Sequence, residues 1–159
     1  MTGIQLTGKM KPPTTLVKQD KTTDWYDPMT DSIYLTGATW NGKSAESLAC
    51  AAHECGHAIQ KHRKTLAWRC WSLLPATKPL WWLAIAVGAM EWLSDNRQTS
   101  AVFGCIAVFL SLLRYFVVLW LEHEASEIAL AAMPDMGGQI DILRARTVLR
   151  GKLKTYAVR

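Results

Sequence analysis

The 21-residue apolar segment from Ala101 to Leu121 constrains the fold of this chain most strongly. As a helix rising 1.5 Å per residue it would be about 31 Å long, roughly the thickness of the hydrocarbon core of a bilayer. Thirteen of its residues are Leu, Ile, Val or Phe, and their gain on insertion exceeds the cost of about 2.5–3.5 kcal/mol for Arg114. Arg114 lies two turns from Leu121, so its head group can reach the nearer interface. The segment therefore predicts a transmembrane helix.

A second, weaker apolar segment runs from Pro79 to Leu93 and could extend back to Trp68, with kinks at Pro75 and Pro79. Tryptophans near its ends are typical of a membrane interface. The polar linker Ser94–Ser100 is short, so the two segments predict a helical hairpin over residues 68–121. Charged residues make up only 19 % of the chain, below the quarter typical of soluble proteins, and this supports the membrane interpretation. The alternative is a soluble protein with the hairpin as its core.

Positive charge predicts the topology of this hairpin. Five basic residues, from Lys61 to Lys78, precede the apolar segment Pro79–Leu93, whereas the linker carries only Arg97. The positive-inside rule then places both ends of the hairpin in the cytosol and the linker outside. Because the basic residues flank apolar segments, we expect them to set topology rather than to bind nucleic acid. Met1–Lys18 has no apolar core, so no secretory signal peptide is predicted there.

The first 43 residues favour strands and loops. Ile4–Leu6 and Leu16–Val17 are candidates for short strands, and Pro12-Pro13 disfavours helix around them. Asp24–Asp31 predicts a turn. Ser32–Thr36 has the β-branched and aromatic composition of a strand.

Residues 44–64 change to a helical pattern, with Ser44 as N-cap. This helix carries the sequence His53-Glu54-Cys55-Gly56-His57. His53 and His57 are one turn apart, so both imidazoles can reach one Zn²⁺. Glu54 is then placed to take a proton from zinc-bound water, which would attack a peptide carbonyl. The alternative is a pair of solvated surface histidines.

A catalytic zinc site needs a third protein ligand and an open fourth position. Glu122 is the best candidate for that ligand, because the hairpin returns there to the side that carries the histidine helix. Glu124, Glu127 and His123 are rivals that spacing does not exclude. Ser126, one turn after Glu122, is placed to hydrogen-bond a ligand.

Several of these segments together resemble one known family. Ala51–Gln60 reads A-A-H-E-C-G-H-A-I-Q, Asp24–Pro28 reads D-W-Y-D-P, Glu122–Ser126 reads E-H-E-A-S, and Leu153–Tyr156 reads L-K-T-Y. In these segments the chain resembles the YugP-like neutral zinc metallopeptidases, which are membrane-bound bacterial proteases. The decapeptide matches the family sequence at every position.

The resemblance implies a zincin-like membrane peptidase with zinc bound by His53, His57 and Glu122. It also implies Glu54 as the general base and suggests Tyr156 as a stabiliser of the oxyanion. The expected location is the bacterial cytoplasmic (inner) membrane, with the active site facing the cytosol and a polypeptide substrate at the membrane surface. The strand Ile33–Leu35 is expected to bind that substrate as an added strand.

We therefore predict a single membrane metallopeptidase domain over residues 1–159, mainly α-helical with a transmembrane hairpin and a short β element. Residues 1–43 form the strand and loop region, 44–64 the metal-binding helix, 68–121 the membrane hairpin, and 122–159 a third-ligand helix followed by a basic C-terminal helix.

The alternative function is a non-catalytic membrane subunit of a larger assembly. The chain is shorter at both ends than typical members of the family, and its basic C-terminal helix would dock the partner. The zinc site would then be structural, and a fourth protein ligand such as His123 or Glu124 would close it.

Overall fold

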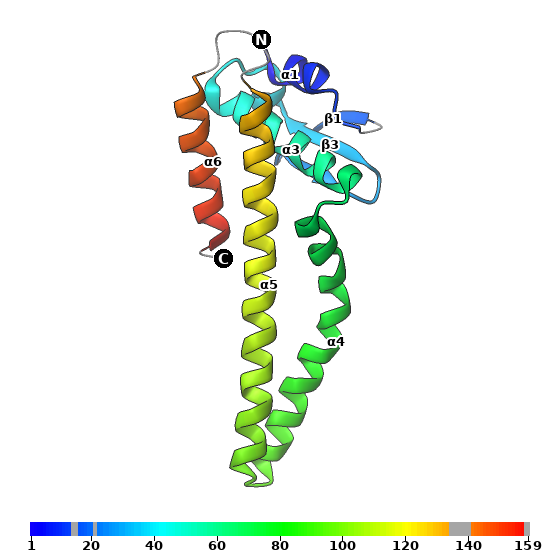
Figure 1. Cartoon of the computed structure of the whole chain (residues 1–159), viewed down its shortest axis with the longest axis vertical. Coiled ribbons are helices and arrows are strands. Elements are labelled where there is room, and N and C mark those ends of the chain that lie inside the picture. The colour runs from blue at the N-terminus through cyan, green and yellow to red at the C-terminus, as the bar shows by residue number, and fades with distance from the viewer. Residues whose placement is uncertain (14–15, 21, 134–140, 158–159) are drawn as a thin grey trace. The chain divides into compact units, whose positions relative to one another are not determined.

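The structure is a computed structural model that describes residues 1–13, 16–20, 22–133 and 141–157, without the side chains of Leu16 and residues 154–157. It is mainly α-helical with one small three-stranded sheet, as the sequence predicts (Figure 1). The chain forms two compact units. Unit 1 comprises residues 1–65 and 121–159, and unit 2 comprises residues 66–120.

The helix α3, Ala45–Arg63, is the centre of unit 1, and the prediction of a helix over residues 44–64 is confirmed. It begins at Ser44, whose Oγ accepts a hydrogen bond from the Ser47 amide at 3.2 Å. It ends at Lys64, which has a left-handed backbone conformation. Most of the alanines of α3 are completely buried, because α1, the sheet and α6 all pack against this helix. Small side chains let these neighbours approach closely.

The sheet has the order β1-β3-β2, with β1 (Leu16–Asp20) parallel and β2 (Trp25–Asp27) antiparallel to β3 (Ser32–Thr36). The predicted strands at Leu16–Val17 and Ser32–Thr36 are confirmed. The prediction of a turn over Asp24–Asp31 is wrong in its first half, because Trp25–Asp27 is a strand. Trp25 stacks on Tyr34 with ring centroids 4.6 Å apart, and this cross-strand pair favours the strand.

The position of β3 corrects the predicted mode of substrate binding. Ile33 lies opposite Val17 on one side and Tyr26 on the other. Both edges of β3 are therefore occupied across Ser32–Tyr34, and no backbone groups remain there to pair with a peptide. The prediction that the strand Ile33–Leu35 binds a substrate as an added strand is therefore wrong for Ile33 and Tyr34, which are paired on both sides.

The predicted strand at Ile4–Leu6 is also wrong, because these residues lie in α1, Gly3–Met10. Thr2 and Gln5 form a capping box that starts this helix, and Leu6 is fully buried. The helix ends before Pro12, so the prolines act only as its boundary. A short helix, α2 (Gly37–Asn41), follows β3 and leads to α3.

Unit 2 consists of α4, Leu66–Leu93, and of α5, Arg97–Ala132, as far as Trp120. Both helices are long and apolar enough to cross a membrane. Pro75 and Pro79 lie inside α4 without ending it. Only residues 94–96 separate the helices, so the linker is shorter than the predicted Ser94–Ser100. The helix α5 continues past Leu121, so Glu122 lies on the same helix as the second apolar segment and not on a separate one.

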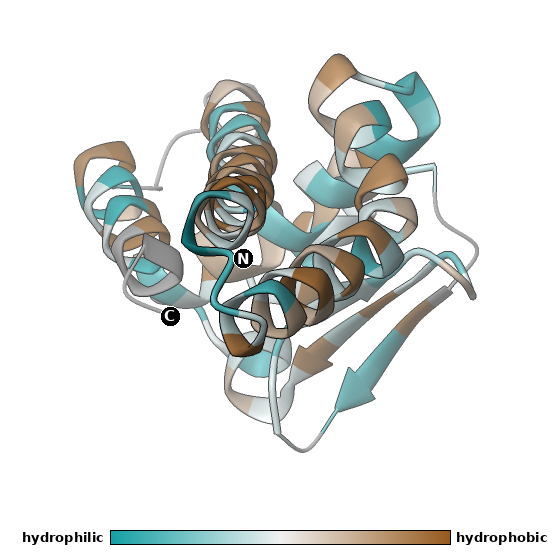
Figure 2. Ribbon diagram, turned by 90° about the horizontal axis from the view of Figure 1, so that it is seen from below, coloured by the Kyte–Doolittle hydropathy of each residue, from teal (hydrophilic) through white to brown (hydrophobic). Residues whose placement is uncertain are grey.

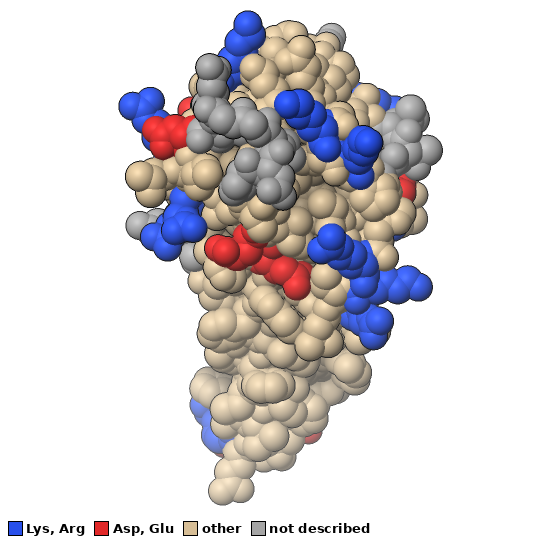
Figure 3. Space-filling model, turned by 45° about the horizontal axis from the view of Figure 1, so that its top comes forward, with Lys and Arg blue, Asp and Glu red and all other residues tan. Residues whose placement is uncertain are grey.

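The two helices expose most of their apolar side chains. Only 17 % of the apolar window of α4 and 11 % of that of α5 are buried. Figure 2 shows hydrophilic residues at the linker and mainly hydrophobic ones along the helices that it joins. On the face drawn in Figure 3, few charged side chains cover the hairpin. A hairpin that formed the core of a soluble protein would be mostly buried.

The last described element is α6, Ile142–Ala157, which belongs to unit 1 and packs against α3. Its residues Ala145 and Leu149 are buried, at 0 % and 1 % exposure. Lys152 lies one turn beyond them on the same helix. The predicted basic C-terminal segment is therefore a helix that packs beside the histidine helix.

Candidate metal centre

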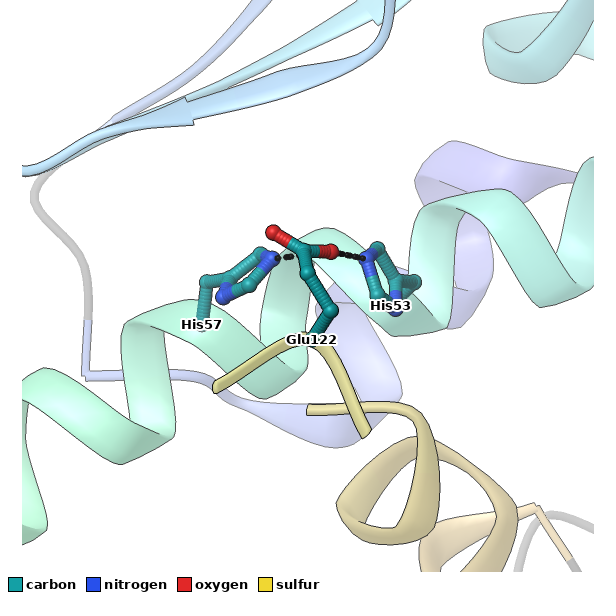
Figure 4. A group of neighbouring side chains, drawn as sticks. All are labelled: His53, His57 and Glu122. Carbon is teal, nitrogen blue, oxygen red and sulfur yellow. Dashed lines mark hydrogen bonds and ion pairs between the residues drawn. The ribbon is translucent and has the colours of Figure 1, made fainter. Parts of the chain in front are cut away.

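Three side chains from two helices of unit 1 converge on one point (Figure 4). His53 and His57 come from α3, and Glu122 comes from α5. Their candidate ligand atoms all lie within 4.8 Å of one another. Glu122 Oε2 is 3.0 Å from His53 Nε2 and 3.5 Å from His57 Nε2. The structure thus brings together the three residues that the resemblance to the family implies as zinc ligands.

Gly56 allows α3 and α5 to approach closely at this point. A Cβ atom on Gly56 would lie 2.4 Å from the carbonyl oxygen of Ala125, closer than such contacts occur in proteins. That contact is with backbone, which cannot rotate away as a side chain can. The glycine between the two histidines is therefore what lets Glu122, one turn before Ser126 on α5, reach both imidazoles.

Ser126 determines which nitrogen of His53 faces the site. Its hydroxyl donates a hydrogen bond to the Glu122 carbonyl oxygen at 2.9 Å. The Oγ atom also lies 3.2 Å from Nδ1 of His53. Because the hydroxyl proton is already used, Oγ is an acceptor for the Nδ1–H group, and Nε2 presents its lone pair to the site. The expected hydrogen bond between Ser126 and a candidate ligand residue is confirmed.

Gln60, for which the sequence did not predict a role, has the same effect on His57. Its Oε1 is 3.0 Å from Nδ1 of His57. Its amide nitrogen donates to the Leu121 carbonyl at 2.9 Å and to Glu124 at 2.7 Å, which identifies Oε1 as the acceptor. Nε2 of His57 therefore also presents its lone pair to the site. The signal in the sequence was the spacing of three residues from His57 on a helix.

The three groups perturb one another electrostatically. Burial opposes the charged form of Glu122, but hydrogen bonds and charge from His53 and His57 outweigh it and lower the pKa of Glu122 to about 2. Burial also opposes a charged His57, but the hydrogen bond and charge of Glu122 outweigh it, and the pKa of His57 is raised. The carboxylate is therefore ionised at neutral pH, and it favours protonation of His57 where no cation lies between the two groups.

This arrangement fits a zinc ion. Two imidazole lone pairs and a carboxylate face one another, and such acceptors are stable together only with a cation or a proton between them. Two nitrogens and one oxygen are a donor set that zinc commonly takes at catalytic sites. Hydrogen bonds from the other ring nitrogens hold both histidines in the tautomer that ligation needs.

The rival third ligands lie outside this group. His123 and Glu127 are exposed. Glu124 instead accepts hydrogen bonds from Gln60 and from Thr65, the latter at 2.6 Å. Among the residues that the structure describes, no fourth His, Cys, Asp or Glu joins His53, His57 and Glu122.

Glu54, the predicted general base, follows His53 in α3 and is buried, and its charge acts on His57. Its Oε1 lies 3.9 Å from the Lys152 ammonium group of α6. Burial disfavours the charged form of Lys152, but the charges of Glu54 and Cys50 outweigh it and raise the pKa of Lys152. Lys152 is therefore a cation beside the predicted base. Tyr156, four residues later, has a side chain outside the described residues, so its predicted role stays untested.

One known protein family matches the chain over most of its length. The model of the family described as "putative neutral zinc metallopeptidase" matches residues 14–159. The match covers the sheet, the histidine helix, both apolar helices and α6. Together with the His-His-Glu group, it identifies zinc as the cofactor. Neither a curated protein nor a solved structure matches the chain significantly.

Proposed function

Since the chain belongs to this zinc metallopeptidase family, we propose that it is a membrane-bound endopeptidase that cleaves polypeptides at the cytosolic face of the bacterial cytoplasmic membrane. The observation that carries this proposal is the convergence of His53, His57 and Glu122 beside the buried carboxylate of Glu54. A metal-binding group and an adjacent base are the two components that hydrolysis of a peptide bond by activated water needs.

Each residue of the site then has one task. Zinc, when bound by His53, His57 and Glu122, supplies the positive charge that lowers the pKa of a water molecule and polarises the peptide carbonyl. Glu54 accepts the proton of that water and passes it to the leaving amine. Ser126 and Gln60 keep both imidazoles in position while this proceeds.

The number of candidate ligands supports catalysis over a structural zinc site. Structural sites carry four protein ligands, whereas catalytic ones keep a position for water or substrate. The group contains three residues within the described part of the chain. His123 and Glu124, which would close the site in a non-catalytic subunit, face solvent and other partners.

The membrane location is supported by the exposed surface of the two apolar helices. Large apolar side chains such as Leu83, Trp92, Val108 and Phe116 are more than half exposed. In water this surface would drive aggregation, whereas in a bilayer it is solvated by lipid. The excess of basic residues before the apolar segment Pro79–Leu93 supports a cytosolic location for unit 1 and the candidate site.

The experiment that tests the function compares wild type with Glu54→Gln. Both proteins would be purified in detergent, and their zinc content and cleavage of casein and of membrane-derived peptides would be measured. We expect about one zinc in each protein. Cleavage should fall by about 100-fold or more in Glu54→Gln, because an amide cannot accept the proton.

Two results would contradict the proposal. Zinc in both proteins without cleavage of any substrate by wild type would favour the non-catalytic subunit of a larger assembly. Equal cleavage by both proteins would exclude Glu54 as the base.

A further inference from the structure

A groove in unit 2 combines two cations with aromatic and apolar walls. It lies between α4 and α5 and has a volume of about 400 Å³. Its lining includes Lys78, Trp81 and Trp82 from α4 and Leu110, Ser111 and Arg114 from α5. Trp81 Nε1 donates a hydrogen bond to Ser111 Oγ at 2.9 Å and so joins the two helices at the groove.

The two cations have no partner in the described part of the chain. Neither the Lys78 nor the Arg114 side chain forms an ion pair or a hydrogen bond with a described residue. The acidic residues of unit 2 are Glu91 and Asp95, which lie at the linker and contact Asn96 and Arg97. A cation in an apolar hairpin is unfavourable unless an anion compensates it.

Lys78 and Arg114 lie at a similar depth along the hairpin. Lys78 precedes the end of α4 by 15 residues, and Arg114 follows the start of α5 by 17 residues. At 1.5 Å per residue, they are about 22 Å and 25 Å from the linker. In a hydrocarbon core about 30 Å thick, with the linker at the outer interface, both lie within about 8 Å of the cytosolic interface. Long basic side chains reach headgroup phosphates from there.

We propose that this groove binds one anionic phospholipid of the cytosolic leaflet. Its phosphate lies between Lys78 and Arg114, and an acyl chain lies along Trp81, Trp82 and Leu110. This assignment rests on the membrane insertion included in the proposed function, but not on peptidase activity.

The chemistry of the groove favours this occupant over others. Two cations without a nearby carboxylate attract a headgroup with net negative charge and gain less from a zwitterionic one, whose ammonium group they repel. The tryptophan and leucine walls match an acyl chain but offer nothing to a free phosphate ion. A peptide would leave backbone groups unpaired against these walls.

Native mass spectrometry of the full chain in detergent tests the proposal. Phosphatidylglycerol and phosphatidylcholine with identical acyl chains would be titrated separately. We expect one phosphatidylglycerol to bind about 10-fold or more tightly than phosphatidylcholine. The double variant Lys78→Gln/Arg114→Gln should lose this preference.

Matched variants separate a specific site from general charge. Arg97→Gln removes a basic residue at the linker and should leave the preference unchanged. Lys78→Arg/Arg114→Lys keeps both charges and should retain it. The zinc content of every variant shows whether unit 1 remains folded, and this readout does not depend on cleavage.

Three outcomes would overturn the proposal. These are equal affinity for the two lipids, full retention of the preference by the Gln variant, and displacement of the lipid by millimolar inorganic phosphate. The last would identify a phosphate site. A chain without peptidase activity that still shows the lipid preference would refute the proposed function but leave the lipid site intact.

Discussion

Lys152 places a positive charge beside the residue that we propose as the general base. The ammonium group is 3.9 Å from the Glu54 carboxylate, and both side chains are largely shielded, at 31 % and 6 % exposure. In such surroundings an ion pair holds a carboxylate in one orientation more firmly than it would at the surface. We therefore regard Lys152 as a positioning residue for Glu54.

Replacing Lys152 should reduce turnover without removing zinc. We expect Lys152→Met to lower kcat by about 10-fold, because the buried Glu54 carboxylate loses the cation that orients it. KM and zinc content should change little. Lys152→Arg should restore most of the activity, and Arg150→Met, an exposed neighbour on α6, serves as control. Full kcat in Lys152→Met would show that the pair has no role in positioning.

At the residue scale, local spacing determined how much of the site could be predicted. His53, Glu54 and His57 follow from helical periodicity, and Gln60 could have been found by the same spacing. Glu122 could be preferred but not separated from Glu124 by sequence alone, because the choice depends on how α5 packs on α3. Lys152 carried no local signal, since only tertiary packing brings α6 to Glu54.

The approach of α3 to α5 is the element-scale feature on which the site depends. Gly56 is the residue of closest contact, and a Cβ atom there would also lie only 3.1 Å from the Ala125 Cα. If α3 and α5 were farther apart at this point, Glu122 would no longer reach the two histidines.

Gly56→Ala should therefore weaken zinc binding although it alters no ligand. We expect a loss of about 10- to 100-fold in zinc affinity and of about 1–3 kcal/mol in the free energy of unfolding. Gly8→Ala in α1, where a Cβ would meet nothing within 4 Å, is the matched control. Both quantities can be followed by zinc titration and by thermal unfolding in detergent. Unchanged zinc affinity in Gly56→Ala would mean that α5 reaches the site by another packing.

The elements themselves were predictable where one local signal dominated. Ser44 and the alanine-rich stripe predicted α3, and the composition of Ser32–Thr36 predicted β3. Ile4–Leu6 is helical rather than extended because Thr2 and Gln5 form a capping box before it, a signal that outweighs the strand composition of these residues. The strand β2 could not be predicted, because a three-residue strand is stabilised by its pairing with β3 rather than by its own composition. The predicted substrate binding by β3 was wrong for the same reason, since the order of strands in a sheet depends on tertiary packing.

At the scale of the whole molecule, a folded unit with the candidate site is interrupted by an apolar hairpin. Unit 1 contains both ends of the chain, and unit 2 is inserted between residues 65 and 121. The sequence could predict that a hairpin is inserted in the chain, because the length of the apolar segments and the charges beside them can be read from it. It could not predict that the second apolar helix continues into unit 1 and carries Glu122, because no local signal marks where an apolar helix enters a folded unit.

Cysteine labelling tests the proposed topology. A single cysteine at Asn96 in the linker should react with a membrane-impermeant maleimide in intact spheroplasts, because the linker faces outward. A cysteine at the exposed Lys43 of unit 1 should react only after lysis. Native Cys70 and Cys105 would be replaced by serine to remove background, and the remaining Cys50 and Cys55 are buried. Labelling of the Lys43 site in intact spheroplasts would reverse the topology, and labelling of both sites only after lysis would contradict insertion.

The measurement that tests the central claim most directly is the zinc affinity of Glu122→Gln beside that of wild type and Glu127→Gln. All three would be prepared metal-free in detergent and titrated with zinc against a competing chelator. We predict about one tightly bound zinc in wild type and in Glu127→Gln, and a loss of about 100-fold or more in Glu122→Gln. Wild-type affinity in Glu122→Gln would show that Glu122 is not a ligand and would contradict the His53, His57 and Glu122 site.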